Sequence, residues 1–333
     1  MLPKGKNMRE LAYYEAKLEA LRELLAADER VHLISDTITG FLGLSPHRVL
    51  FAEIAKNFPD RVVSPPISEL AVCGLAIGAA MAGLRPVVDL ITASFVFEAW
   101  PQVVNEAANA HYMSGGRTKV PAVFHLLHGL RRGGGAQHSH SPQAMLWNCP
   151  GLEIVLPSSP RDVKGLLKTA VNSDNPTVFI DHVLLFELKG AVPETAEAIR
   201  FGQAEIKRPG GDVTVGATSL MVQRSLAVAQ SLAKEGIQVE VVDPRTLVPL
   251  DFGTIMASLE KTGRMVVVDE CHASCGVAAE LMARVAETGF DKLKAPMQRV
   301  TTLDVPIPYS PPLEDFISPS EARIAGAIRA LVR

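Results

Sequence analysis

The sequence has few cysteines and no excess of charge of either sign. Four cysteines in 333 residues, Cys73, Cys149, Cys271 and Cys275, are too few for a disulfide framework. Cys271 and Cys275 flank His272, but one such pair lacks the second pair of ligands that a structural zinc ion needs, so we predict no metal site on this chain. Lys and Arg (33) nearly balance Asp and Glu (36), which gives no attraction to nucleic acid or to an anionic membrane.

The N-terminal 25 residues lack the uninterrupted apolar segment of a secretory signal, and their charges recur at helical spacing. No internal repeat or low-complexity tract occurs. A hydrophobic content of 47% supports a sizeable core, and the length favours two domains. We therefore expect a cytoplasmic protein that binds a small metabolite and has neither nucleic acid nor membrane as a partner.

Apolar runs separated by helical segments predict a parallel α/β fold. Strands buried on both faces form continuous runs of Val, Ile and Leu rather than alternating patterns. Such runs occur at 31–34, 86–91, 120–127, 152–156 and 177–180. Helices are predicted between them, at 69–82, 98–112 and 159–172. Ser159, Pro160 and Asp162 form the cap, first-turn proline and acidic first turn that are typical of a helix N-terminus.

A polar stretch at 188–211 separates this series from a second α/β series. We predict a first domain over residues 1–190, a linker over 191–208 and a second domain over 209–333. In the second domain, we predict strands at 213–217, 239–242, 265–269 and 297–301. Helices are predicted at 219–235, 251–262, 275–288 and 320–332. The segment VPIPYSPPLED, at 305–315, is predicted to be irregular because it is rich in proline.

Six segments carry a resemblance to a known family. They are RVVSPPISELAVCGLAIGAAMAGLRPVVDL, HYMSGG, GGGAQHSH, NCPGLEIVLPSSPRDVKGLLKTAV, VEVVDPRTLVPLD and VPIPYSPPLE. In this order they resemble the β subunit of the thiamine-diphosphate-dependent decarboxylating component of pyruvate, branched-chain 2-oxo acid and acetoin dehydrogenase complexes, in the transketolase-like superfamily. The resemblance covers nearly the whole chain. It implies two doubly wound α/β domains, a pyrimidine-binding domain followed by a transketolase C-terminal-like domain.

The resemblance gives Glu69 a catalytic role. In the family, a carboxyl group at this position hydrogen-bonds the pyrimidine of thiamine diphosphate and favours the imino form that removes the reactive proton of the cofactor. Glu69 precedes an apolar segment, and apolar surroundings favour the protonated carboxyl group that this role requires. Taken alone, the residue would more simply stabilise a helix N-terminus. Leu70 and Phe95 are the other predicted cofactor-binding residues, although an aromatic side chain is more often part of a core.

His138, in GGGAQHSH, matches the active-site histidine of the family, which assists acyl transfer to a lipoyl group. An imidazole titrates near neutrality and can move a proton in this step, although a histidine on a glycine-rich loop is more often solvated. Before this motif the family usually has Arg-Gly-Pro-Asn-Gly, whereas this chain has HLLHGLRR, from His125 to Arg132. We therefore predict a substrate loop that contains His125, His128, Arg131 and His140. Arg131 is either a partner for a carboxylate or phosphate or a solvated side chain.

The sequence contains no Gly-Asp-Gly segment, with which thiamine enzymes begin their magnesium site. The resemblance therefore implies that thiamine diphosphate is shared with an α subunit, which holds the magnesium. It also implies an assembly of two α and two β chains, so a second β copy is a partner, and a lipoyl acyltransferase core is a further one. The segment at 35–50 also departs from the family pattern.

The expected function is decarboxylation of a 2-oxo acid or cleavage of acetoin, followed by acyl transfer to a lipoyl domain. One alternative is a thiamine-dependent acyl or acyloin transferase of specialised metabolism that uses no lipoyl acceptor. Another alternative is a non-catalytic scaffold of the same fold. Glu69 and His138 together argue against the scaffold, because a scaffold needs neither residue.

Overall fold

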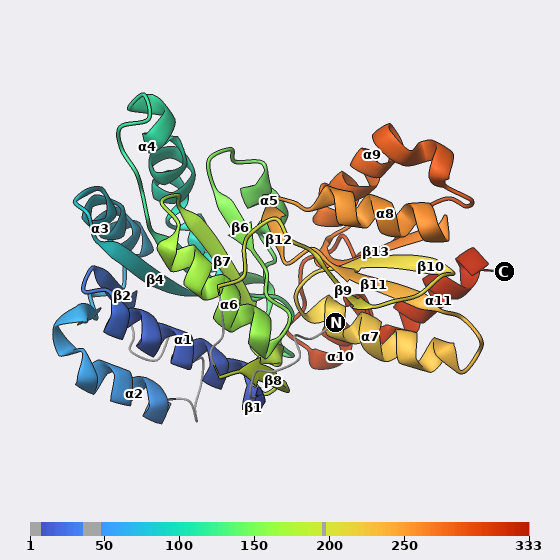
Figure 1. Ribbon diagram of the computed structural model, residues 1–333, viewed down its shortest axis with the longest axis horizontal. Coiled ribbons are helices and arrows are strands. Elements are labelled where there is room, and N and C mark those ends of the chain that lie inside the picture. Colours follow the sequence, from blue (N-terminus) through green and yellow to red (C-terminus); the bar gives the residue numbers. More distant parts are fainter. Residues whose placement is uncertain (1–7, 36–47, 195–197, 333) are drawn as a thin grey trace. The chain divides into compact units, whose positions relative to one another are not determined.

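The computed structural model describes residues 8–35, 48–194 and 198–332 (Figure 1). The contacts between residues divide the chain into two compact units. The first unit extends to His128 and includes Leu146–Phe201; the second comprises Gly129–Met145 and the chain from Gly202 onward. The segment at 129–145 thus belongs with the second unit, although it lies within the predicted first domain. The predicted boundaries at 190 and 209 stay a prediction, and the unusual 35–50 segment lies almost wholly outside the described residues.

The first unit is built on a parallel sheet that is covered by helices on both faces. In spatial order its strands are β6 (Glu153–Val155), β7 (Thr177–His182), β5 (Val123–His128), β4 (Arg85–Thr92), β2 (Val31–Ser35) and β3 (Val62–Val63). One face is covered by α1 (Tyr13–Ala27) and α6 (Pro160–Asn172), and α2 (Arg48–Asn57) packs beside α1 (Figure 1). The other face is covered by α3 (Glu69–Met81), the π-helix η4 (Pro101–Ala107) and α4 (Ala108–Met113).

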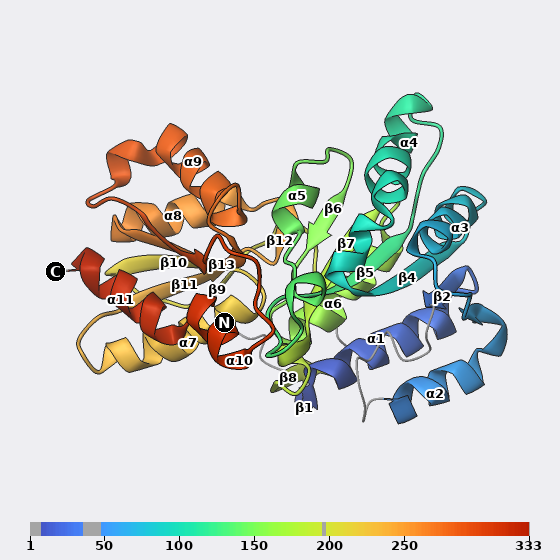
Figure 2. The same ribbon diagram turned by 180° about the vertical axis from the view of Figure 1, so that it is seen from behind.

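The second unit repeats this design with a smaller sheet. Its strands, in spatial order, are β14 (Gln298–Thr302), β13 (Met265–His272), β10 (Val213–Ala217), β11 (Val239–Asp243) and β9 (Glu205–Arg208). All pairs are parallel except the pair of β11 with β9. Figure 2 shows this sheet between two pairs of helices: α7 (Leu220–Ala233) with α11 (Glu321–Val332), and α8 (Phe252–Thr262) with α9 (Val277–Gly289).

Shorter elements complete the two units. In the first unit, β1 (Met8–Ala12) pairs antiparallel with β8 (Lys189–Pro193). The remaining elements are η2 (Pro59–Arg61), η3 (Ala93–Phe97), η5 (Ala136–His138), α5 (Gln143–Trp147), η6 (Val183–Leu185), β12 (Thr246–Val248), η7 (Phe290–Lys292) and α10 (Pro311–Ile317). In the part of the chain that the structure describes, no helix is both long and apolar enough to cross a bilayer.

The parallel α/β prediction is confirmed, and two local predictions are corrected. The Ser159 hydroxyl accepts a hydrogen bond from the amide of Asp162 at 3.2 Å, so the predicted cap of α6 is present. The proline-rich segment at 305–315 is not wholly irregular, because α10 begins at Pro311, where a first-turn proline loses no helical hydrogen bond. The predicted helix at 98–112 is instead a π-helix followed by the short α4.

One glycine gives a direct test of the packing in the first unit. Gly151 has a φ of +102°, and a Cβ atom added there would lie 2.1 Å from the carbonyl oxygen of Ala108. We predict that Gly151→Ala lowers the free energy of unfolding by about 2–6 kcal/mol, through backbone strain and overlap, in urea titrations of the purified chain. The control is Gly326→Ala, at an exposed position in α11 where an added Cβ atom would have no neighbour within 4 Å. This substitution should raise the free energy of unfolding by up to about 1 kcal/mol. Equal effects would contradict the packing described.

Candidate cofactor and catalytic site

Glu69 is the first residue of α3, and the helix cap beside it is already supplied. The Ser68 hydroxyl accepts a hydrogen bond from the amide of Ala71 at 3.4 Å. Glu69 is half-buried, and its carboxylate makes no hydrogen bond or ion pair with another described residue. An acidic residue in the first turn favours the helix dipole, but capping by Ser68 leaves the Glu69 carboxylate available to a ligand.

A small gap lies between Glu69 and strand β4. Glu69, Val72, Asp89 and Leu90 line it. Asp89 is 1% exposed, and its Oδ2 atom has no hydrogen-bond partner among the described residues. A buried carboxylate oxygen without a partner is costly, so a donor from outside the described residues would stabilise it. The gap combines two carboxyl groups with two apolar side chains, which are groups of the kind that bind an aminopyrimidine with N–H donors, but the gap itself has no room for a water-sized molecule.

The backbone next to this gap is strained. Ile91 has a φ of +58°, which a β-branched residue rarely adopts, and its amide donates a hydrogen bond to Asp89 Oδ1 at 3.0 Å. Such conformations cost about 1–3 kcal/mol and concentrate at ligand sites. Sequence patterns gave no sign of Ile91 or Asp89, because Asp89 lies inside an apolar run and backbone strain leaves no mark in the sequence.

The other two predicted cofactor residues lie on neighbouring elements. Leu70 follows Glu69 in α3 and is 46% exposed. Phe95 lies in η3, directly after β4, and is half-buried. Neither is among the described residues that line the gap. Their exposed surfaces are available to a partner or a ligand, and their role in cofactor binding stays a prediction.

The structure corrects the placement of His125, which lies in strand β5 rather than in a loop and is 1% exposed. Its ring joins a buried cluster that we call the buried ion cluster: Lys17, Asp89, His125 and Asp181. Lys17 Nζ lies 2.7 Å from Asp181 Oδ2 and 2.6 Å from His125 Nε2. His125 Nδ1 lies 2.7 Å from Asp89 Oδ1, and Nε2 lies 2.9 Å from Asp181 Oδ2. The Tyr13 hydroxyl also donates to Asp181.

The charges in the buried ion cluster shift the pKa values of two members. Burial and the charge of Lys17 oppose an imidazolium, but Asp89 and Asp181 outweigh them and raise the pKa of His125 above 6.5. Burial alone would raise the pKa of Asp181, but Lys17 and His125 hold it well below its usual range. Each carboxylate of the cluster thus has a nitrogen donor beside it, Lys17 at Asp181 and His125 at both Asp89 and Asp181, which offsets part of the cost of burying them.

His128 is also a strand residue, so its predicted place in a loop is wrong. It ends β5, where its backbone is paired with His182 at the end of β7. The two rings are 5.0 Å apart at 84°, and both side chains are at most 1% exposed. His182 was missed by the sequence analysis, although its position just after the predicted strand at 177–180 was a usable sign, because ligands of parallel α/β sheets bind at the carboxyl ends of strands.

Arg131, His138 and His140 lie in one compact loop of the second unit. The Gly129 amide donates to the His140 carbonyl at 3.3 Å, which closes the loop, and the Arg131 guanidinium donates to the His138 carbonyl. The His138 side chain is exposed. Burial, and then the charge of His272, lower the pKa of His140. The structure thus brings these three predicted residues together, and it places Glu69 in the other unit.

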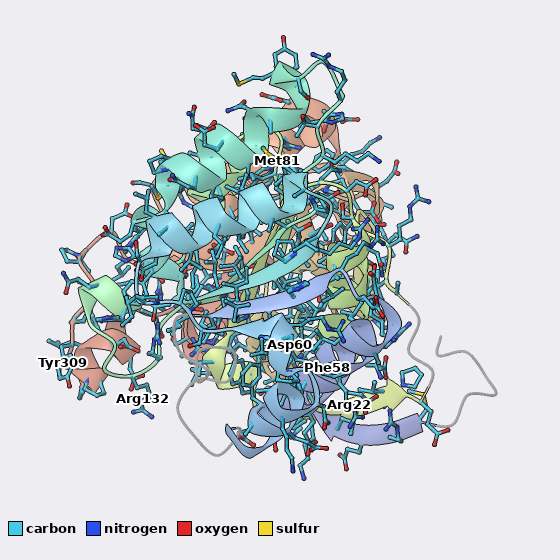
Figure 3. The ribbon with its side chains drawn as sticks, turned by 90° about the vertical axis from the view of Figure 1, so that its left-hand side faces the viewer. Arg22, Phe58, Asp60, Met81, Arg132 and Tyr309 are labelled. Carbon is cyan, nitrogen blue, oxygen red and sulfur yellow. The ribbon has the colours of Figure 1, made fainter. Side chains whose placement is uncertain are left out.

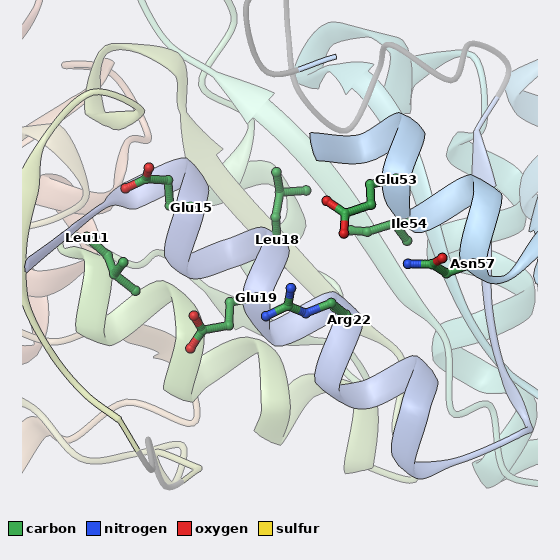
Figure 4. A pocket seen from close by; sticks show the side chains of 8 residues that line it. All are labelled: Leu11, Glu15, Leu18, Glu19, Arg22, Glu53, Ile54 and Asn57. Carbon is green, nitrogen blue, oxygen red and sulfur yellow. The ribbon is translucent and has the colours of Figure 1, made fainter. Parts of the chain in front are cut away.

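A larger cavity, of about 190 Å³, lies between α1 and α2 (Figure 4). Three glutamates line it together with Arg22. Burial would raise the pKa of Glu19, but its bonds to Arg9 and Lys164 lower that pKa to about 2, so the carboxylate is ionised and already paired. Acidic walls repel a diphosphate, and this cavity does not fit the predicted cofactor.

The alternative of a metal at the cysteine pair finds no support in the described part of the chain. Cys271 is buried and its thiol donates to the Ser141 carbonyl at 3.3 Å, whereas Cys275 is exposed. No group of three or more His, Cys, Asp or Glu side chains among the described residues is placed to hold a metal ion.

Comparison with known proteins identifies the family. Residues 9–187 match the transketolase pyrimidine binding domain, and residues 202–324 match the transketolase C-terminal domain. The β subunit of acetoin:2,6-dichlorophenolindophenol oxidoreductase from Cupriavidus necator is 40% identical, over 98% of this chain and 98% of that protein. The pyruvate dehydrogenase E1 component subunit β from Rickettsia conorii is 40% identical, over 95% of this chain and 96% of that protein. The chain belongs to the family of thiamine-diphosphate-dependent 2-oxo acid dehydrogenase β subunits.

A solved structure of a split gene transketolase, an inactive beta4 tetramer, shares the fold of this β subunit. It has a TM-score of 0.77 and 23% identity, over 97% of this chain and 99% of that one. The predicted family, the fold class of two doubly wound α/β domains and the assignment as an enzyme component are therefore confirmed.

The buried ion cluster gives a prediction for the stability of the β subunit. Lys17→Met should lower the free energy of unfolding by about 3–5 kcal/mol, because it leaves the buried Asp181 carboxylate without its lysine partner. The control is Lys119→Met, which removes an exposed ion pair with Asp174 at 2.6 Å and should change stability by less than about 1 kcal/mol. Urea titrations of both variants measure the difference, and similar values would show that the cluster contributes no more than a surface pair.

The raised pKa of His125 predicts a pH dependence. Protonated His125 favours the folded state. The difference in free energy of unfolding between wild type and His125→Gln should therefore be largest below pH 6.5, the ordinary pKa of histidine. It should fall as the pH rises through the raised native pKa. Asp181 does not interfere, because its lowered pKa alters stability only at acid pH. Urea titrations across neutral and alkaline pH measure this difference; a difference that grows with pH would contradict the assignment.

Proposed function

We propose that this β subunit, together with a separate α subunit, decarboxylates a 2-oxo acid or cleaves an acetoin-like substrate, and that it passes the acyl group to a lipoyl domain. One observation carries the proposal: the Glu69 carboxylate has no partner among the described residues, and it lines the same gap as Asp89, whose Oδ2 atom has no partner there either. Relatives named for pyruvate and acetoin support these substrate classes.

In this mechanism the β subunit acts on the pyrimidine end of thiamine diphosphate. When bound, thiamine diphosphate would supply a nucleophilic carbon and an electron sink for decarboxylation. Glu69 would hold its pyrimidine by sharing a proton with a ring nitrogen. Leu70 and Phe95 pack against the ring and exclude water, and His138 moves a proton during acyl transfer.

The α subunit is proposed because this chain holds only the residues for the pyrimidine. It contains no Gly-Asp-Gly segment, so we assign magnesium and the diphosphate to the α subunit. The related split gene transketolase forms an inactive tetramer of β chains alone, which supports a requirement for the partner. The proposed assembly has two α and two β chains and binds a lipoyl acyltransferase core. Its cytoplasmic location stays a prediction from the N-terminal sequence.

A transferase that uses no lipoyl acceptor is the second candidate. It is favoured by one feature, the departure of the loop around Arg131 and Arg132 from the family pattern directly before His138. A loop beside the acceptor site is where a change of acceptor would appear. Wild-type complex that decarboxylates its substrate but acylates no lipoyl domain would select this candidate.

The role of Glu69 is tested in a complex reconstituted with the α subunit. We predict that Glu69→Gln lowers the rate of dye reduction by about 10²–10⁴-fold with pyruvate, branched-chain 2-oxo acids and acetoin, because an amide cannot share its proton with the ring nitrogen. Glu321→Gln is the matched control: Glu321 is likewise the first residue of a helix, α11, but it is exposed in the other unit. Full activity of Glu69→Gln would reject the mechanism.

The role of His138 is tested by separating two assays on the same complex. His138→Ala should slow acylation of a lipoyl domain by about 10²-fold or more and leave dye reduction within about threefold of wild type, because the histidine moves a proton only in the transfer step. His111→Ala, at an exposed histidine of α4, controls for the loss of a surface imidazole. Equal losses in both assays would place His138 in decarboxylation instead.

A further inference from the structure

A buried glutamate of α10 holds the loop that carries His138. Glu314 is 2% exposed. Its Oε1 accepts a hydrogen bond from the Arg132 amide, and its Oε2 accepts one from the Gly133 amide at 3.0 Å. Both carboxylate oxygens are therefore used by backbone donors of one loop, and no described cation forms an ion pair with them. Hydrogen bonds from amides to an ionised carboxylate are stronger than those to a neutral acceptor.

The loop needs such anchors because its conformation is costly. Arg132, Gly133 and Gly135 have φ values of +61°, +115° and +66°. At Gly134, an added Cβ atom would lie 2.4 Å from the Ser139 hydroxyl oxygen. A non-glycine residue with positive φ persists only where its surroundings hold it, and at Arg132 the backbone is held by Glu314.

A chain of contacts leads from these anchors to His138. The Leu130 amide donates to the buried Glu270 carboxylate at 2.8 Å, so two glutamates hold three amides at the start of the loop. Arg131, between them, donates to the carbonyl of His138. Burial lowers the pKa of Arg131, and the charge of Glu314 opposes this shift.

Exposed side chains surround the anchored loop, but they do not hold it. Arg132 is 65% exposed at its side chain and pairs at 3.1 Å with Asp315, which is 56% exposed. Figure 3 shows Arg132 and Tyr309 at the outer surface of the second unit. An exposed ion pair contributes little to stability. Asp315 contacts the side chain of Arg132, whereas Glu314 holds the backbone of the same residue, so we expect Glu314 to matter far more for the loop.

We propose that Glu314 is a positioning residue for acyl transfer: its buried carboxylate fixes the backbone at Arg132 and Gly133, and through Arg131 it fixes the position of His138. The inference rests on the proposed function and adds to it the residue that sets the geometry of the transfer step. The PPLE and GGGAQHSH segments, far apart in the sequence, thereby act on one loop.

The experiment uses the reconstituted complex with Glu314→Gln, which keeps the size of the side chain and removes its charge. We expect acylation of a lipoyl domain to slow on the order of 10²-fold, since small displacements of a reacting group have effects of this size, and dye reduction to stay within about threefold of wild type. Asp315→Asn is the matched control and should leave both rates unchanged. If Glu314→Gln does not assemble, Glu314→Asp, which keeps the charge and shortens the reach, should show the same split.

A double-mutant cycle separates positioning from a structural role. In the His138→Ala background, Glu314→Gln should change acylation by less than about twofold, because a residue that acts through His138 has no effect once the imidazole is gone. Hydrogen exchange supplies a readout that does not depend on activity. The amides of the loop at 129–140 should exchange at least about tenfold faster in Glu314→Gln than in Asp315→Asn.

The outcomes distinguish the two proposals. Wild-type complex that acts on no 2-oxo acid or acetoin would reject the proposed function. An active wild type with unchanged acylation in Glu314→Gln, with equal losses in both assays, or with additive effects of the two substitutions would overturn the positioning role alone. Unchanged hydrogen exchange of the loop would overturn it as well, whatever the reaction of the enzyme is.

Discussion

The first unit depends on how it neutralises the charges buried in its centre. The buried ion cluster connects α1 with β4, β5 and β7, and each of its charges loses hydration that only its neighbours replace. A one-residue slip of β5 would turn His125 to the other face of the sheet and remove it from Asp89 and Asp181. The cluster thus fixes the register of the strands, and with it the position of Asp89 beside Glu69.

Buried carboxylates serve a different purpose in the second unit. Glu270 and Glu314 accept hydrogen bonds from backbone amides of the His138 loop. In the buried ion cluster of the first unit, by contrast, the carboxylates lie beside the side chains of Lys17 and His125. An amide donor is rigidly attached to the chain, so such a bond specifies a backbone conformation, whereas an ion pair between side chains specifies a distance between elements. The first kind suits a loop that must present a side chain, and the second suits a sheet that must stay in register.

The sequence predicts those features that depend on neighbours along the chain. The cap of α6 follows from three adjacent residues, and β2, β4 and β7 follow from continuous apolar runs. Glu69 could be singled out only through the order of the surrounding motifs. Lys17 and Asp181 are 164 residues apart, and no local pattern indicates that pairing. The error at His125 is instructive, because the apolar run at 120–127 already predicted a strand there, and the family pattern of a substrate loop displaced that prediction.

His125 has a structural role in the first unit. Its ring lies 2.7 Å from Asp89 Oδ1 and 2.9 Å from Asp181 Oδ2, and the residue is 1% exposed. Lys17, from α1, pairs with Asp181 in the same cluster. Since the side chain of His125 is buried in this cluster, it is not available to a substrate. His138 is exposed and lies in a loop whose backbone Glu314 holds, so it is better placed than His125 to meet an acceptor.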